Sequence, residues 1–324
     1  MTALHRLLAA TAFFSFSLAT AQADAHLSVH YKGKSGPGKG KQVVLVSGDE
    51  EYRSEECLPM LGKVLAEHHG FDCTVLFSVN DKGEIDPNNQ MSVTSSKAFD
   101  TADLIVMALR FRNWLDVDMK HFEDAYIRGV PIVGLRTSTH AFQFKGNSAY
   151  KSYNGFGRNV LGENWVSHWG HHKRQGCRGV VEEANKSHPI LKGATDVFAD
   201  SDVYEAHPPK DVKILLRGAV TESLAPTSKP IAGKKNTPMM PVAWTREHKN
   251  PKGKTNRIFC TTMGAATDFK SEGLRRLVVN AVYWGLEMED KISATGNVAP
   301  VGDYQPSMYS FNGFKKGVKP ADHK

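Results

Sequence analysis

Four short, continuous apolar runs constrain the fold of this chain more than any other feature. They are QVVLVSG (42–48), CTVLFSV (73–79), DLIVMAL (103–109) and PIVGLRT (131–137). A run that is apolar at every position is typical of a parallel strand covered on both faces. Helical patterns separate the runs: Leu58, Leu61 and Leu65 recur at helical spacing before Gly70, and a second helix begins near Asp116 and is closed by Gly129. This order predicts an α/β fold with a doubly wound, mostly parallel sheet.

The second half of the chain begins with a long stretch without periodicity. Residues 138 to about 178 are rich in Gly, Asn, His and aromatic residues. A stretch of roughly 40 residues without regular structure inside a compact domain is typical of a lid or binding loop. Shorter strand candidates follow at RGVVEEA, VKILLRGAV, MPVAWTRE and NRIFCTTMG, and a last long helix is expected from about Ser271 to Glu287. We therefore expect one α/β domain over 42–291 with a long loop insertion, followed by a Pro/Gly-rich tail over 292–324 that docks as an extended strap.

The N-terminus has the layout of a secretory signal peptide over residues 1–23. A short basic patch precedes an apolar run from Leu7 to Leu18, and small residues at Ala19, Ala21 and Ala23 follow. The apolar run is shorter than the ~20 residues that a membrane-spanning helix needs, and no other run is long enough. A Gly/Lys-rich linker, 24–41, follows. The sequence predicts an exported protein, periplasmic or extracellular, without a membrane span.

Charge and motif content argue against several classes of function. The net charge of +7 is spread over the linker and the basic tail, without the interleaved aromatic and arginine residues of a nucleic-acid surface. GPGKGK precedes the first strand and so cannot act as a phosphate-binding loop, and no GxSxG elbow is present. We expect no nucleotide and no nucleic acid as partners. The four cysteines are widely spaced, and the sequence does not choose among their possible pairings.

Polar residues follow the expected strands where parallel sheets bind their ligands. The crevice beyond the carboxyl ends of the strands is the usual binding place in an open α/β sheet. Acids, arginines, a histidine and tryptophans fall there or in the loop that leaves from the same edge. The candidates for substrate binding are Arg110, Asp49, Trp114, Trp165, Trp169 and Asp268, and those for chemistry are His140, His168, His172, Glu51 and Arg136. Helix-start acids, surface arginines and core tryptophans remain alternative interpretations.

The loop segment ENWVSHWGHHKRQGCRG (163–179) holds three histidines within five residues, at 168, 171 and 172. His168 and His172 are four apart, which on a helical turn puts two imidazoles on one face, as a two-histidine metal site requires. His140 could supply a third imidazole, and together they suit a divalent metal such as zinc or manganese. Gly170 makes a regular helix doubtful. Three interpretations stay open: metal ligands, metal-free acid/base or substrate-binding residues, and structural loop histidines.

Several long strings resemble the trehalose-utilisation-like (ThuA-like) family, in particular its exported branch in planctomycete-type bacteria. They include VVLVSGDEEYRSEECLP, VGLRTSTHAF, GFGRNVLGENWVSHWGHH and NTPMMPVAWT, and the resemblance spans about 42–291. It implies a flavodoxin-like fold similar to that of the class I glutamine amidotransferases. Those enzymes place a nucleophilic cysteine in a Gly-x-Cys turn after a central strand, whereas this turn reads Gly134-Leu135-Arg136. Glutamine amidotransferase chemistry is therefore not expected.

The resemblance also implies the handling of sugars, in particular oxidised (3-keto) glycosides, and a divalent metal held by histidine in some relatives. The leading hypothesis is an exported carbohydrate-processing enzyme. A histidine or carboxylate base would remove the acidic proton next to the carbonyl of a keto-glycoside, with a metal or arginine holding the enolate, and elimination or isomerisation would follow. The alternative is a sugar-binding module without catalysis. The expected partner in either case is a small-molecule carbohydrate, and the sequence does not define the oligomeric state.

Overall fold

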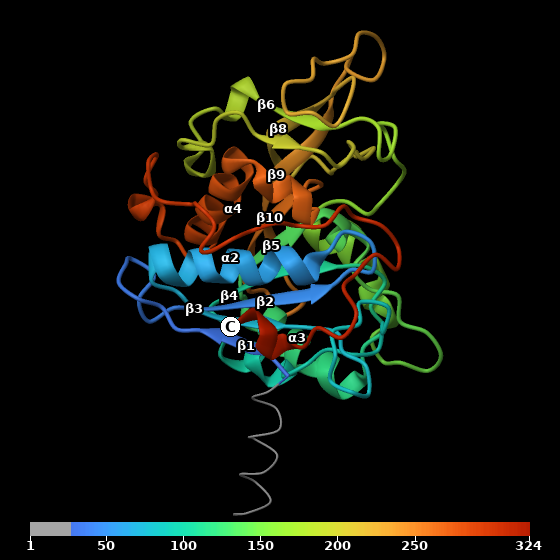
Figure 1. Ribbon diagram of the computed structural model, residues 1–324, viewed down its shortest axis with the longest axis vertical. Coiled ribbons are helices and arrows are strands. Elements are labelled where there is room, and N and C mark those ends of the chain that lie inside the picture. Colours follow the sequence, from blue (N-terminus) through green and yellow to red (C-terminus); the bar gives the residue numbers. More distant parts are fainter. Residues whose placement is uncertain (1–26) are drawn as a thin grey trace, which may run out of the picture.

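The computed structural model describes residues 27–324 as an α/β structure built on one mixed sheet of ten strands (Figure 1). The predicted signal peptide, 1–23, lies outside the described residues. The strand order across the sheet is β1-β3-β2-β4-β5-β10-β9-β8-β6-β7. The strands are β1 (Val29–Tyr31), β2 (Gln42–Gly48), β3 (Asp72–Leu76), β4 (Leu104–Leu109), β5 (Ile132–Leu135), β6 (Cys177–Val181), β7 (Phe198–Ala199), β8 (Lys213–Val220), β9 (Met240–Lys249) and β10 (Thr255–Thr261).

The helices connect and cover these strands. The α-helices are α2 (Ser54–His69), α3 (Asp116–Arg128) and α4 (Glu272–Gly285). Short 3-10 turns are η1 (Ser96–Thr101), η2 (Arg136–His140), η3 (Lys151–Gly155), η5 (Glu183–Asn185), η6 (Pro189–Leu191), η7 (Ala266–Lys270), η8 (Glu289–Lys291) and η9 (Pro320–His323), and η4 (Gly157–Leu161) is a π-turn. None of the described helices is long and apolar enough to cross a bilayer.

One half of the sheet is parallel and is formed by the four predicted apolar runs together with β10. Strand β2 lies between β3 and β4, and β5 lies between β4 and β10, all in parallel pairs. Successive residues of β2 face opposite cores: Val43 and Leu45 pack with α2 and α4, whereas Val44 and Val46 pack with α3. Figure 1 shows α2 in front of β2 and β4. Burial on both faces is the reason these strands carry apolar residues in succession rather than in alternation.

The other half of the sheet is antiparallel, which corrects the predicted arrangement. Strands β9, β8, β6 and β7 extend the sheet beyond β10 through antiparallel pairs. The chain between β9 and β10 is a tight turn in which Asn250 N–H donates to the Lys254 carbonyl at 2.9 Å. A connection this short can join only antiparallel strands, since a parallel pair needs a crossover of a dozen residues or more. The α/β class is confirmed, and the sheet is mixed rather than mostly parallel and flavodoxin-like throughout.

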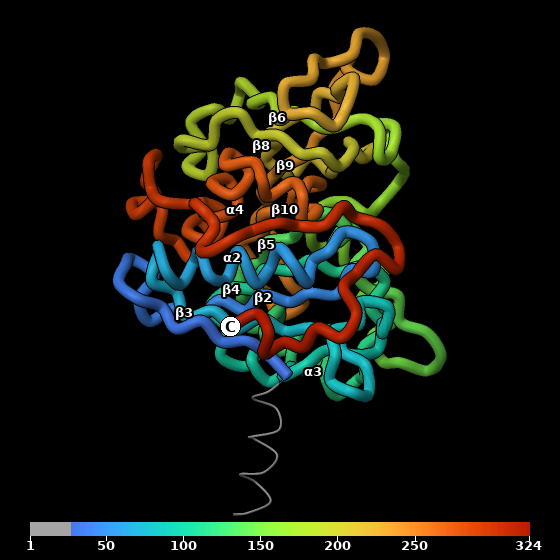
Figure 2. The backbone as a smooth tube through the Cα atoms, in the orientation of Figure 1, coloured from blue at the N-terminus to red at the C-terminus, as the bar shows by residue number. Residues whose placement is uncertain are grey.

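Both ends of the described chain pack on the domain. Within the range predicted as a linker, Val29–Tyr31 forms the edge strand β1, paired antiparallel with β3. In Figure 2 the C-terminal segment passes in front of α2, follows the side of the domain where the parallel strands end, and returns toward β1. There the Tyr31 hydroxyl donates to the His323 carbonyl at 2.6 Å. The tail therefore lies over the same edge of the sheet at which the sequence places its candidate site.

Candidate active site

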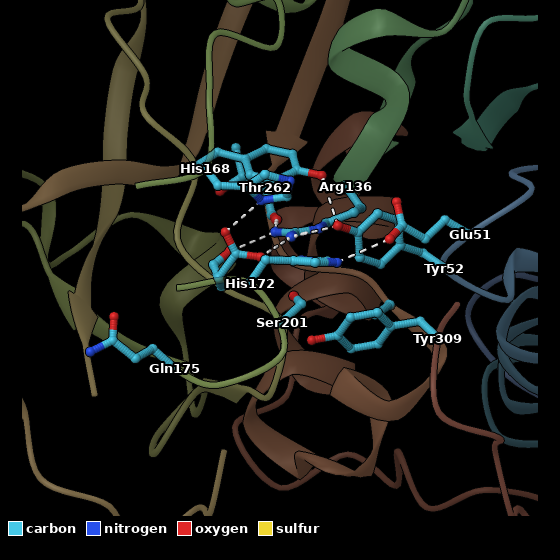
Figure 3. A network of polar contacts seen from close by, with 12 residues as sticks. Glu51, Tyr52, Arg136, His168, His172, Gln175, Ser201, Thr262 and Tyr309 are labelled. Carbon is cyan, nitrogen blue, oxygen red and sulfur yellow. Dashed lines mark hydrogen bonds and ion pairs between the residues drawn. The ribbon is translucent and has the colours of Figure 1, made fainter. Parts of the chain in front are cut away.

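The site is formed where β2, β4 and β5 end and where two later segments come back to them (Figure 3). Glu51 follows β2, Arg110 follows β4, and Arg136 and His140 lie in the η2 turn directly after β5. The long loop contributes His168 and His172. The segment after β7 contributes Asp202 and Tyr204. Chain segments far apart in sequence thus meet at the carboxyl edge of the parallel strands, as expected for ligand sites in such sheets.

Arg136 lies at the centre of this cluster and is buried. Its backbone φ is +44°, so the chain turns sharply after β5 and directs the guanidinium inward. One terminal nitrogen donates to the carbonyls of Asp202 and Thr262, both at 2.7 Å, and the other donates to Asp202 Oδ1 at 2.9 Å and to the Tyr52 hydroxyl at 3.1 Å. The rings of Tyr52 and Tyr204 lie 4.6 and 3.7 Å from the guanidinium carbon.

The placement of Arg136 corrects its predicted role as a direct anion stabiliser. Both terminal nitrogens are occupied by protein groups, and the side chain has almost no exposed surface. Arg136 therefore acts through Asp202, whose carboxylate it holds in place and keeps ionised.

Asp202 joins the two histidines of the loop. His168 Nδ1 lies 2.8 Å from Asp202 Oδ2, and His172 Nδ1 lies 3.1 Å from Oδ1. Burial opposes ionisation of this carboxyl, but the Arg136 guanidinium and the hydrogen bonds from both imidazoles hold the pKa of Asp202 well below its usual range. Because an ionised carboxylate only accepts hydrogen bonds, both Nδ1 atoms must donate. His168 then presents its Nε2 away from Asp202, and its side chain is 36% exposed.

His172 bridges two carboxylates. Its Nε2 lies 3.0 Å from Glu51 Oε1, while its Nδ1 contacts Asp202. These hydrogen bonds, to Asp202 first and to Glu51 second, raise the pKa of His172 to about 8. Burial would raise the pKa of Glu51, but its hydrogen bond and charge interaction with His172 lower it. Near neutral pH the arrangement is therefore an imidazolium held between two carboxylates.

His140 is a half-buried neighbour of this network rather than a member of it. Its ring centroid lies 4.9 Å from that of Phe111 and 5.8 Å from that of Trp165. Burial, followed by the positive charges of Arg110 and Arg136, lowers the pKa of His140 to about 3. The imidazole is neutral at physiological pH and is a weak base, which makes it a poorer candidate for proton abstraction than the sequence suggested.

Arg110 is held at the mouth of the site by a buried pair behind it. Arg112 has no exposed surface and donates to Glu50 Oε2 at 2.7 Å, while Arg110 donates to Glu50 Oε1 at 3.1 Å. Arg110 keeps 21% of its side chain exposed. It is the arginine of the site that a substrate can reach.

Four predicted substrate-binding residues are held in contacts within the protein. Trp114 is 2% exposed and packs in the aromatic core on α3, with Phe122 among its neighbours. The Trp169 indole donates to the Lys235 carbonyl at 2.8 Å and packs against the other core. Asp49 accepts from the backbone N–H groups of Glu51 and Tyr52 and from the Thr137 hydroxyl, so it shapes the turn after β2.

Asp268, the fourth of these, is buried and holds two loops together. Its carboxylate accepts from Ser201 N–H and hydroxyl at 2.9 and 2.6 Å and from the N–H groups of Gly264 and Ala265. It thereby fixes the segment that carries Asp202. Trp165, in contrast, lies at the site as predicted: it is 37% exposed and its ring centroid is 5.7 Å from that of His168.

The sequence does not predict Asp202 and Tyr204 as site residues. Tyr52 falls in the polar patch after the first predicted strand, beside Glu51, but its sequence context assigns it no role. Asp202 and Tyr204 fall in a segment without periodicity, far from any strand expected to end at the site. The acidic spacing Asp200–Asp202 was the one available signal, and it does not by itself distinguish a solvent-exposed turn from a buried carboxylate.

The donor atoms of the network are compatible with a divalent metal. One ligand atom each from His168, His172 and Asp202 lies within 4.8 Å of the others. Glu51 lies next to this group through His172. Two imidazoles and a carboxylate are a donor set that zinc and other first-row metals accept. The predicted third imidazole, His140, is not part of the group.

Fold and site together define an α/β protein with an imidazole-, carboxylate- and arginine-lined site at the carboxyl edge of parallel strands. The family model described as trehalose utilisation, ThuA, matches residues 42–285, and the chain therefore belongs to this family. A ThuA-like protein from Parabacteroides merdae has a similar structure, with a TM-score of 0.52 and 16% sequence identity, covering 84% of this chain and 98% of that one.

Two further solved structures match more weakly. The N-terminal domain of mmIFT52 has a TM-score of 0.38 at 9% identity, covering 76% of this chain and 97% of that one. An exo-beta-1,4-mannosidase from an Opitutaceae bacterium has a TM-score of 0.28 at 10% identity, covering 76% of this chain and 36% of that one. No curated protein matches the chain significantly in sequence.

Proposed function

We propose that this protein is an exported enzyme that processes glycosides, in particular keto-glycosides, by histidine-assisted proton abstraction. Membership of the trehalose-utilisation family supports a carbohydrate substrate, and the signal-peptide pattern of the sequence supports export. The observation that carries the chemistry is the Asp202 carboxylate, which binds Nδ1 of His168 at 2.8 Å and leaves Nε2 directed away from it. A carboxylate on one imidazole nitrogen fixes the tautomer whose other nitrogen accepts a proton.

His168 is the general base of this proposal. A carbonyl group in a sugar ring acidifies the C–H bond on the neighbouring carbon. His168 Nε2 removes this proton, the electron pair of the C–H bond forms a C=C bond, and the π pair of the carbonyl moves to its oxygen as an enolate. Proton transfer between the two neighbouring oxygens and return of the proton from His168 to the former carbonyl carbon move the carbonyl by one position, which is isomerisation. Re-formation of the carbonyl with expulsion of a β-glycosidic oxygen, which takes the proton from His168, is elimination.

A positive group within reach of the substrate would stabilise the enolate. Arg110, which is partly exposed, is the candidate for this role. His172 lies beside His168, with the two ring centroids 4.5 Å apart, but both of its nitrogens are hydrogen-bonded to Asp202 and Glu51, so its charge balances these carboxylates. Charges fixed in place by the protein stabilise a developing anion without reorganisation, which is the largest contribution in many enzymes. Arg136 contributes indirectly by orienting Asp202.

The same donor set offers a metal-assisted version of this function. His168, His172 and Asp202 would hold a divalent ion such as zinc or manganese, with Glu51 close to them. Such an ion supplies Lewis-acid polarisation of a carbonyl oxygen when it is bound. In that case Glu51 is the remaining carboxylate next to the group and would take the role of base.

The test is deuterium exchange into 3-keto-trehalose, followed by NMR in D2O. The wild-type protein is expected to exchange the proton next to the carbonyl, and His168→Gln is expected to slow this exchange by about 100-fold. His171→Gln is the matched control, since His171 is an exposed neighbour in the same loop. Binding of the sugar without any exchange or product would identify a non-catalytic sugar-binding module instead.

Elemental mass spectrometry of protein purified without chelator separates the two versions. Metal bound near one equivalent in the wild type and lost in both His168→Ala and His172→Ala supports the metal-assisted version. Wild-type exchange activity without metal, and unchanged by added zinc or manganese, supports the histidine base.

A further inference from the structure

The C-terminal segment 304–314 belongs to the site although it lies outside the part of the chain that the family model matches. It runs along the edge at which the parallel strands end (Figure 2). It is attached through both backbone and side chains: Ser307 N–H donates to Glu56 at 2.7 Å, and the Tyr304 hydroxyl donates to the Ala266 carbonyl at 2.7 Å. The sequence predicted an extended strap here. The structure shows which residues it brings to the site.

Tyr309 is the residue that fixes this strap against the catalytic network. It is 1% exposed, and its hydroxyl donates to the Asp200 carbonyl at 3.1 Å. Its ring centroid lies 5.0 Å from that of Tyr52 and 5.7 Å from that of His172 (Figure 3). The strap therefore packs directly against Tyr52 and His172.

Phe311, two residues further on, presents an aromatic ring to solvent at the same place. Its side chain is 51% exposed. The Arg110 guanidinium lies 5.0 Å from the centre of the Phe311 ring and 4.7 Å from the centre of the Phe111 ring. Asn312, with φ of +57°, turns the chain directly after Phe311 and accepts from the Asn88 side chain at 3.0 Å. An exposed phenylalanine held in this way is a fixed platform rather than a free tail side chain.

Planar groups connect Phe311 to the general base of the proposed reaction. From Arg110 the contacts pass to Phe111, then to His140 at 4.9 Å, to Trp165 at 5.8 Å and to His168 at 5.7 Å between ring centroids. His168 contacts His172, and His172 contacts Tyr309 of the strap. Residues 309–311 join the two ends of this series. Trp165 and Phe311 are its members with the most exposed aromatic surface.

We propose that Phe311 forms a second sugar subsite, which binds the ring of a disaccharide-type glycoside that does not undergo reaction. This inference rests on the proposed function and specifies its substrate class. The C–H face of a pyranose packs on an exposed aromatic ring, and Arg110 beside that ring donates to sugar hydroxyls. No ring of the series contacts both His168 and Phe311, so a sugar ring packed on Phe311 is a second ring beside the one that meets His168. The strap thus selects disaccharides over monosaccharides.

The experiment compares the binding of trehalose and glucose to the full-length mature protein by isothermal titration calorimetry. Phe311→Ala is expected to weaken trehalose binding by about tenfold and to change glucose binding by less than about twofold, because only the second ring loses its platform. Phe311→Tyr should restore wild-type trehalose affinity. Met308→Ala is the matched control, since Met308 is 44% exposed on the same strap and has no ring.

The outcomes separate this inference from the function on which it rests. Unchanged trehalose affinity in Phe311→Ala, or an equal loss for both sugars, overturns the subsite while leaving the proposed function in place. A wild-type protein that binds neither sugar, and that also fails to bind or exchange 3-keto-trehalose, overturns the proposed function and the subsite together. Circular dichroism of each variant confirms folding; the exposed position of Phe311 makes a folding defect unexpected.

Discussion

Arg136 lies in the turn after β5 and has a backbone φ of +44°. A non-glycine residue with positive φ costs roughly 1–2 kcal/mol, and nothing in the residue type favours that conformation. Four hydrogen bonds to Asp202, Thr262 and Tyr52 offset this cost. The turn was recognisable from the sequence as the place after a buried strand. The direction of the side chain depends on Asp202 and Tyr204, which come from another part of the chain.

At the residue scale we predict a pH dependence of stability from His172. Its pKa is raised to about 8 in the folded protein, against an ordinary value near 6.5. The contribution of protonated His172 to the free energy of unfolding is therefore fully present below about pH 6.5 and is lost as the pH rises through about 8. We expect the difference in free energy of unfolding between wild type and His172→Gln to shrink by about 1 kcal/mol from pH 6 to pH 9, discounted for the partial exposure of the ring.

Urea unfolding with EDTA present, at several pH values, measures this difference without a contribution from metal. His171→Gln serves as the control and should show no pH-dependent difference from wild type, because His171 is exposed. A constant difference between wild type and His172→Gln from pH 6 to pH 9 would show that the imidazole does not carry a charge between Glu51 and Asp202.

At the element scale the long loop is fixed to the strand edge by close backbone contact. Gly157 begins the π-turn η4 and lies directly against the η2 turn: a Cβ atom there would be 1.8 Å from the Thr139 carbonyl oxygen and 2.7 Å from that of Glu163. Both neighbours are backbone atoms and cannot move aside independently. The loop predicted to be without structure is therefore packed at this point onto the turn that carries Arg136 and His140.

We predict that Gly157→Ala destabilises the protein by about 3 kcal/mol, since overpacking against backbone forces the two turns apart. Thermal unfolding followed by circular dichroism measures the loss. Gly155→Ala is the matched control, because a Cβ atom there meets mainly the movable side-chain nitrogen of Asn159, and it should cost less than about 1 kcal/mol. Equal midpoints for both variants would show that the loop is not held through Gly157.

At the scale of the whole molecule, the site depends on the chain that leaves β7, at the far edge of the sheet, and comes back to the parallel strands. Strand β7 is separated from β10 by three strands in the sheet order, yet the residues that follow it reach the end of β10. Ser201 N–H donates to Asp268 Oδ1 at 2.9 Å, and Phe198 N–H donates to the Ser271 hydroxyl at 3.2 Å. These contacts place Asp202 beside Arg136. The segment after β7 thus supplies the carboxylate that binds Arg136 and both histidines.

The cysteines give a prediction for the molecule as a whole. Cys57, Cys73, Cys177 and Cys260 are free and buried, and burial raises the pKa of each thiol. We expect no rapid reaction with a thiol reagent such as DTNB in the native protein and four reactive thiols after unfolding in urea. The thermal midpoint should be the same with and without dithiothreitol. Fewer than four thiols after unfolding, or a midpoint lowered by the reductant, would indicate a disulfide.

The sequence predicted the parallel half of the fold well because its signal is local. Largely apolar runs, such as 42–48 and 104–109, are buried on both faces. The antiparallel pairing of β8, β9 and β10 was not predicted. Strands with mixed burial carry the same local pattern in either orientation, and pairing is decided by connections and partners rather than by the strands themselves.

For the site, the sequence by itself determined which residue types gather at the ends of the strands. Glu51, Arg110, Arg136 and His140 each come at or after the end of an apolar run. Because the parallel strands all end at the same edge of the sheet, these residues lie at that edge. Only the tertiary structure decided that Trp114 is core, that Asp268 ties two loops together, and that Asp202 and Tyr309 complete the network. The physical reason is that burial and hydrogen bonding depend on partners distant in sequence. The residues next to a carboxyl group or an aromatic ring in the sequence do not indicate which charged group or which apolar surface it will contact in the fold.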